Sequence, residues 1–357
     1  MYYIENWDKI QKRFEEFWAR ENHDRPIISI KAPKNRQTAG KLPSFATLKE
    51  RWLDTEYMLQ EANLQFQNTF YAGEAFAALN PNLGPDLFAA CYGTELEFGE
   101  DTSWAIHSMT DSEVEEYKGL VIEKQGFYYQ KILEMTRAAV EDGKDKYVVG
   151  VTDLHPAADA LVSLRGPETL CIDTIDNPQF VRKATLDLFE GFKQIFTDLC
   201  DITTKYQKGT TNWMGIWHPK RWYVTSCDFC CMISTDMFED LFMEELEKEL
   251  DFLDASIFHL DGPGALRHLD RLLQIEKLKG IQWVYGAGQP TASHWLEVLK
   301  KIQNAGKLIQ VAVEPQELDV MLENLAPEGV MYVINADSED QAKELMKKAE
   351  QYKRKVF

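Results

Sequence analysis

Two residues with chemically active side chains, His259 and Asp261, are two positions apart at the end of the apolar run Ser256–Leu260. Side chains two apart on a strand point to the same side, so the imidazole and the carboxylate are expected to face one space together. Gly262 follows directly and leaves room for a ligand. The pair could be half of a metal site or a catalytic acid/base pair. The alternative is a His–Asp hydrogen bond that braces the strand end.

Two further metal ligands are expected from other parts of the chain. Cys227 and Cys230 have C-x-x-C spacing, which can bind zinc, but the chain has no second C-x-x-C pair. A closed structural site made of cysteines is therefore not expected, and Cys227 is the thiol proposed as a ligand. Glu314 follows an apolar run and precedes Pro315. It is a candidate metal ligand or general base, or a cap for the helix that begins at Pro315.

Other polar and aromatic side chains follow predicted strands and could line a pocket. Asp153 and His155 follow the run Tyr147–Thr152. We expect His155 to be a catalytic residue that transfers protons and Asp153 to contact the substrate. Aromatic side chains commonly line apolar pockets, although the same residues could simply pack a loop onto the fold. The other expected substrate contacts are Trp217, His218, Trp222, Tyr223, Tyr285 and Gln289.

The elements that must position these residues alternate along the chain. Strands are expected at Ile27–Ile30, Tyr147–Thr152, Thr211–Ile216, Ser256–Leu260, Ile281–Tyr285, Leu308–Val313 and Val330–Asn335. Helices are expected at Ile4–Glu21, Ser44–Gln65, Pro178–Lys205, Asp236–Leu253, Leu266–Ile275, Ser293–Ala305, Pro315–Leu325 and Ser338–Tyr352.

This alternation predicts a parallel sheet, and its regular succession favours closure into a (β/α)₈ TIM barrel over an open sheet. The barrel forms one domain over residues 1–357, with a helical segment at its start and loop insertions at its mouth, mainly within residues 66–119. No G-x-G-x-x-G turn or P-loop follows a strand, which argues against the nucleotide-binding α/β folds.

Composition limits the partners of the protein. A net charge of −19 repels phosphate backbones, so nucleic-acid binding is not expected. No apolar run is long enough to span a membrane, and residues 1–20 do not resemble a signal peptide. The adjacent Cys230 and Cys231 do not suggest a framework of separate disulfides, so reduced thiols in the cytoplasm are expected.

Five blocks of sequence resemble the uroporphyrinogen decarboxylase superfamily, which also contains corrinoid-linked methyltransferases. The resemblance covers nearly the whole chain and is strongest to a divergent branch described as trimethylamine-corrinoid-like. The blocks are Trp18…Asp24-Arg-Pro26, Asp153-Leu-His155…Leu164-Arg-Gly166, Ser226–Ser234…Phe238, Phe258–Pro263 and Tyr285–Pro290.

The resemblance implies a modified zinc site. The methyltransferases of the superfamily carry His-x-Cys-Gly at a strand end, and a later cysteine completes their site. His259 and Gly262 match, but Asp261 replaces the cysteine and no cysteine follows Cys231. The implied variant uses His259, Asp261 and either Cys227 or Glu314.

The resemblance also implies a function, with three alternatives open. The favoured one is a metal-assisted methyltransferase that acts on a small methylated compound with a separate corrinoid protein. Asp153-Leu-His155 is similar to a D-x-H-x-x-G corrinoid motif, but Ala158 replaces the glycine, so this chain itself is expected to bind no corrinoid. The others are a metal-free lyase or decarboxylase of a small carboxylate or sugar-derived ligand, and a non-catalytic ligand-binding barrel. A homodimer is the candidate assembly.

The superfamily's decarboxylase grips its porphyrin substrate with paired arginines in a loop after the first strand. In this chain the corresponding loop holds Lys31, Lys34 and Arg36 but no paired arginines. The net charge of −19 is also unfavourable for a substrate with several carboxylates. Porphyrin decarboxylation is therefore not expected.

Overall fold

The strands of the second half of the chain lie side by side in the order in which they occur. The computed structural model describes residues 1–351. Its main sheet has the order β2-β1-β11-β10-β9-β8-β7, and every neighbouring pair is parallel except β1 and β2. Its strands are β1 (Ile27–Pro33), β2 (Thr69–Gly73), β7 (Trp222–Ser226), β8 (Ala255–Asp261), β9 (Gly280–Val284), β10 (Leu308–Ala312) and β11 (Val330–Asn335).

The first and last strands of this series pair with each other, with Ile28 opposite Tyr332. Two more parallel strands, β3 (Ala78–Leu79) and β6 (Val148–Val149), pair only with each other. Within residues 1–351, no strand ladder joins that pair to β1 or β7. The fold is therefore mixed α/β with a mostly parallel central sheet, and closure into an eight-stranded barrel is not confirmed.

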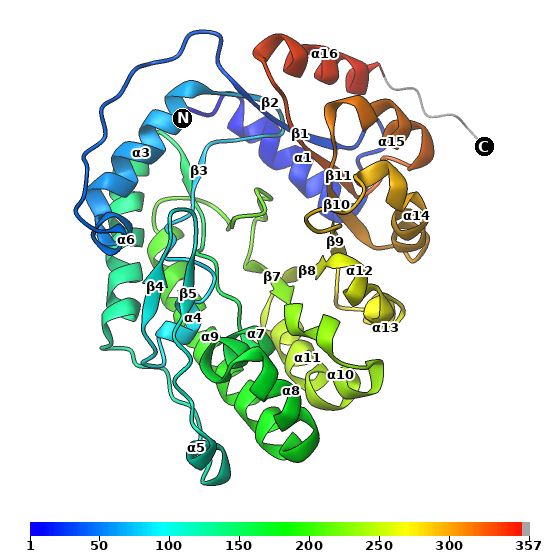
Figure 1. Ribbon diagram of the computed structural model, residues 1–357. Helices are drawn as coiled ribbons and strands as arrows, with labels where there is room; N and C mark the ends of the chain where they lie inside the picture. The colour runs from blue at the N-terminus through cyan, green and yellow to red at the C-terminus, as the bar shows by residue number, and fades with distance from the viewer. Residues whose placement is uncertain (352–357) are drawn as a thin grey trace.

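Helices follow the strands around the outside of the sheet, as Figure 1 shows for α10 to α16. They are α1 (Trp7–Ala19), α2 (Leu48–Leu53), α3 (Thr55–Asn68), α4 (Leu87–Ala90), α5 (Asp111–Glu115), α6 (Phe127–Gly143), α7 (Ala157–Arg165), α8 (Pro167–Asp176), α9 (Pro178–Thr203), α10 (Thr235–Leu241), α11 (Met243–Phe252), α12 (Gly262–Ala265), α13 (Leu269–Gln274), α14 (Leu296–Asn304), α15 (Leu318–Asn324) and α16 (Glu339–Glu350). Within the described residues, no helix combines the length and the apolar character that crossing a membrane requires.

Helix α1 packs across the amino ends of the strands. The Trp7 ring lies 5.1 Å from that of Phe76, just before β3, and Trp18 donates a hydrogen bond from Nε1 to the Trp217 carbonyl, ahead of β7. Asn22, just after α1, donates to the carbonyl of Pro327, ahead of β11. Because α1 occupies this end, the carboxyl ends of the strands are the side on which a site can open.

Two of the predicted long helices are each divided. The Ser44–Gln65 prediction covers α2 and α3, because Thr47 forms a capping box with Glu50 and Asp54 has an extended backbone that starts α3. The Asp236–Leu253 prediction covers α10 and α11, which meet at Phe242. The predicted helix end at Tyr352 lies outside the described residues.

The insertion expected within residues 66–119 contains β2 and an antiparallel hairpin of β4 (Leu96–Phe98) and β5 (Ser103–Ala105). Its residues pack against α7, which begins just after His155.

Candidate active site

Strand β8 carries His259 and Asp261 on the same side of the sheet. Both side chains are partly exposed, whereas Leu260 between them is fully buried. Gly262 follows the strand with φ 74°, a left-handed conformation that glycine adopts readily, and the chain turns there into α12. The imidazole and the carboxylate therefore both project at the carboxyl end of the strand.

A chain of hydrogen bonds orients His259. Its Nδ1 lies 2.5 Å from Oε1 of Gln282, its partner on β9. The Gln282 amide donates to Oε1 of Gln310 at 2.8 Å, and the Gln310 amide donates to the Met214 carbonyl at 2.7 Å. Because each glutamine amide nitrogen donates to the next acceptor, the Gln282 oxygen is left to accept a hydrogen bond from His259. The proton is then on Nδ1, and Nε2 is free to bind a ligand.

Asp228 completes a set of three donors with these two residues. It follows β7 in the 3₁₀ turn Asp228–Met232, and its Oδ1 lies 3.8 Å from Nε2 of His259. One donor atom from each of Asp228, His259 and Asp261, here called the His259 set, lies within 4.8 Å of the other two. Asp228 was not among the ligands predicted from the sequence, although its position directly after Cys227 at a strand end was a signal.

A second group of donors shares Asp228. His155, Asp159 and Asp228, here called the His155 set, also place one donor atom each within 4.8 Å of one another. Nε2 of His155 lies 3.1 Å from the Asp153 carboxylate, and its Nδ1 lies 3.8 Å from Oδ2 of Asp159. Asp159, on α7, was also missed, although it follows His155 by four residues.

Neighbouring groups hold Asp159 in place. The hydroxyl of Ser226, at the end of β7, donates to Oδ2 of Asp159 at 2.9 Å, and the backbone N–H of Phe229 donates to its Oδ1 at 3.2 Å. Asp159 is 9% exposed. Its carboxylate is therefore fixed between β7 and the turn that carries Asp228.

The crowding of carboxylates alters the acidity of the site. Burial and the nearby Asp159 and Asp261 carboxylates raise the pKa of Asp228 to about 6, against the opposing effect of His259 and His155. Burial alone would lower the pKa of His155, but Asp153 and Asp159 outweigh it and hold the pKa well above its ordinary value. Negative charge contributes to both shifts, and within residues 1–351 the ion pairs of these carboxylates are with the two imidazoles alone.

A cavity of about 390 Å³ lies beside the His259 set and includes Asp261 in its wall. The Trp213 ring stands edge-on to the His259 ring at 5.4 Å. Tyr285, a predicted substrate contact, also lines the cavity. The rest of the wall consists of mostly apolar residues and two glutamine side chains: Met214, Gln282, Trp283, Val284, Gly286, Ala287, Gln310, Ala312 and Val333.

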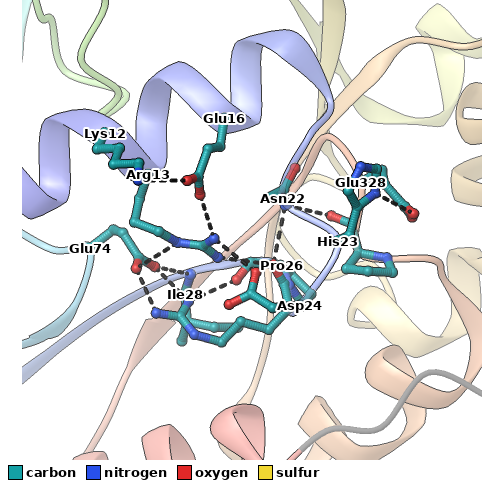
Figure 2. Close-up of polar contacts among 12 residues, drawn as sticks. Lys12, Arg13, Glu16, Asn22, His23, Asp24, Pro26, Ile28, Glu74 and Glu328 are labelled. Carbon is teal, nitrogen blue, oxygen red and sulfur yellow. Dashed lines mark hydrogen bonds and ion pairs between the residues drawn. The ribbon is translucent and has the colours of Figure 1, made fainter.

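A larger cavity of about 760 Å³ lies near the start of β1. Figure 2 shows the polar network in its wall, in which Glu74 contacts Arg13 and the backbone N–H of Ile28. Arg25 forms a two-point ion pair with Glu74 at 2.6 and 2.9 Å. These charges satisfy one another, so this cavity is a structural ion-pair region rather than a second reaction centre.

The structure brings neither Cys227 nor Glu314 to the predicted metal site. Among the described residues, neither belongs to a group of donors close enough to share an ion. Contact with Cys230 and burial hold the pKa of the Cys227 thiol well above its ordinary value, so the thiolate form is disfavoured. Glu314 precedes a 3₁₀ turn, and its backbone N–H donates to the Glu317 carboxylate. This position fits the capping alternative.

The predicted strand Thr211–Ile216 is wrong, and this moves four expected substrate contacts away from the cavity. Trp217 and His218 lie at the amino end of β7, where both rings contact aromatic residues of α1. Trp222 and Tyr223 lie within β7 and are fully buried. Gln289 is exposed and does not line the cavity.

No protein-family model and no curated protein sequence matches this chain. Its fold is similar to that of a solved methyltransferase from Methanosarcina mazei, with a TM-score of 0.62. The match covers 96% of this chain and 98% of that chain, at 10% sequence identity. At this identity the match shows a shared fold.

Proposed function

We propose that this protein is an enzyme of the uroporphyrinogen decarboxylase superfamily, built on a (β/α)₈ plan, that transfers a methyl group with the help of a metal ion. The proposal depends on one observation: the three donors of the His259 set converge beside a largely apolar cavity at the carboxyl ends of β7 and β8. The similarity in fold to a solved methyltransferase supports the choice of reaction.

The chemistry of the donors fits zinc. The His259 set offers one imidazole nitrogen and two carboxylate oxygens, and three protein ligands leave a coordination position for a substrate or water. When bound, the ion would act as a Lewis acid that stabilises negative charge developing on a thiol or a leaving oxygen. The free carboxylate of Asp261 and the oriented Nε2 of His259 would hold it.

The residues around the ion would position the substrate. Trp213, Trp283 and Tyr285 give the cavity broad apolar walls, which suit a small O-, N- or S-methyl compound. Gln282 and Gln310 also line the cavity, and their hydrogen bonds keep the imidazole in one tautomer. A separate corrinoid protein would approach the open carboxyl ends of the strands and accept or deliver the methyl group there.

The test is a methyl-transfer assay with free cob(I)alamin in place of the corrinoid protein. The zinc-loaded protein is incubated with a panel of methanol, methylamines, methyl thioethers and methoxylated aromatics, and methylcobalamin is followed by its absorbance. We expect at least one compound to react, Asp261→Asn to abolish the reaction, and Asp254→Asn, at the opposite end of β8, to retain it. Turnover that releases carbon dioxide from a carboxylate without methyl transfer would instead favour the lyase alternative.

A further inference from the structure

The two donor sets are joined through one residue. Asp228 belongs both to the His259 set and to the His155 set, and a carboxylate has two oxygens that can bind two different ions. Paired metal ions that share a carboxylate are common in sites that activate two oxygens at once. The arrangement places Asp228 between the two imidazoles.

Each imidazole is held in the manner of a metal ligand. Histidines that bind metals nearly always donate their second N–H to a carboxylate or carbonyl, which fixes the tautomer. His259 makes such a contact through Nδ1 to Gln282, and His155 makes one through Nε2 to Asp153. In each ring the other nitrogen is directed to a carboxylate of its own set, Asp228 or Asp159. The two sets therefore repeat one design on different elements.

The charge of the region calls for more than one cation. Four carboxylates, Asp153, Asp159, Asp228 and Asp261, gather around two imidazoles. Within residues 1–351, their only ion pairs are with these imidazoles, and Asp261 has no hydrogen bond or ion pair at all. Asp153 and Asp159 are largely buried, with side chains 21% and 10% exposed, and such carboxylates are normally paired or bound to a metal, because an uncompensated buried charge is costly.

We propose that the His155 set binds a second divalent metal ion, with Asp228 bridging it to the ion of the His259 set. The proposal extends the proposed function, on which the first ion depends. Imidazole and carboxylate donors without a thiolate suit Zn²⁺, Mn²⁺ or Co²⁺. The second ion would lie toward α7, on the far side of Asp228 from Asp261.

The experiment counts bound ions. Protein stripped with a chelator is dialysed against Mn²⁺, the bound metal is measured by mass spectrometry, and the loaded protein is studied by electron paramagnetic resonance. We expect two ions per chain and a spin-coupled signal. In Asp159→Asn and in His155→Asn we expect one ion and the six-line signal of isolated Mn²⁺. Asp254→Asn serves as the matched control and should bind two.

Each outcome has a distinct meaning. A single ion in the wild-type protein that is lost in Asp261→Asn would overturn the second site and leave the proposed function intact. Two ions that persist in Asp159→Asn and His155→Asn would also overturn it. Because the wild-type count and its coupled signal depend on no substitution, misfolding of a variant cannot obscure the answer.

Discussion

Nδ1 of His259 lies 2.5 Å from Oε1 of Gln282, on the next strand of the sheet. This hydrogen bond occupies Nδ1 of the imidazole, and Nε2, which faces Asp228, remains available to bind a metal ion. The tautomer on which metal binding depends is therefore set by a residue that is not itself in the His259 set.

The first prediction concerns this contact. Gln282→Leu keeps the size of the side chain but removes the acceptor, so we expect metal affinity at the His259 set to fall about 10- to 100-fold. Competition with a chromogenic chelator measures it. Gln303→Leu breaks two comparable hydrogen bonds to Ala326, away from the cavity, and should leave the affinity unchanged. Equal losses in both variants would show that Gln282 acts only on stability.

The second prediction separates function from stability at Asp261. Its carboxylate has no hydrogen bond or ion pair in the described part of the chain, and it lies near the Asp228 carboxylate. We expect Asp261→Asn to abolish metal binding at the His259 set while the metal-free free energy of unfolding stays within about 0.5 kcal/mol of wild type or rises. Urea unfolding with and without metal tests this, and a marked loss of metal-free stability would contradict it.

The third prediction concerns the buried ion pair at the amino end of β1. Arg25 and Glu74 are joined at two points, and Glu74 is 3% exposed. Removing Arg25 leaves the buried Glu74 carboxylate with only its longer contact to Arg13 and the Ile28 N–H, so Arg25→Met should lower the free energy of unfolding by about 3 kcal/mol. Lys277→Met removes an exposed pair with Asp251 and should cost less than about 1 kcal/mol. Similar costs for both would refute this ranking.

The fourth prediction concerns two buried glutamates of α11. Glu245 and Glu249 each have an oxygen without a hydrogen-bond partner, and burial, followed by nearby carboxylates, raises the pKa of both well above the usual value. The folded protein then keeps protons that the unfolded chain releases, so these residues make stability fall as the pH rises above about 4.5.

Glu249→Gln removes one of these ionisations. We expect the variant to be more stable than wild type at pH 8, by about 1–3 kcal/mol, and the difference to shrink toward pH 5. Glu244→Gln, exposed on the same helix, should show no such trend. A constant difference between the two pH values would contradict the assignment of the effect to Glu249.

The sequence predicted the part of the site that one strand carries. His259, Leu260 and Asp261 follow an apolar run, and the two-residue period of a strand was enough to place both polar side chains on one side. Asp228 and Asp159 could not be placed in the same way. They reach the site from a 3₁₀ turn and a helix, and no periodicity relates those elements to β8.

The mistaken strand at Thr211–Ile216 has a local cause. The Asn212 side chain accepts the backbone N–H of Met214 at 3.0 Å, and Gly215 has φ 67°. These contacts form a turn, which competes with an extended strand for the same backbone groups. Met214 and Ile216 of this segment are buried, but in a turn, so composition alone did not distinguish the two structures.

The central claim is that Asp228, His259 and Asp261 bind a metal ion beside the cavity. The most direct measurement is anomalous X-ray diffraction at the zinc absorption edge, from crystals grown with Zn²⁺. We predict a peak within bonding distance of Nε2 of His259 and of a carboxylate oxygen of Asp228 and of Asp261. Zinc bound instead by the Cys227 thiol, or no zinc beside a well-ordered His259, would contradict it.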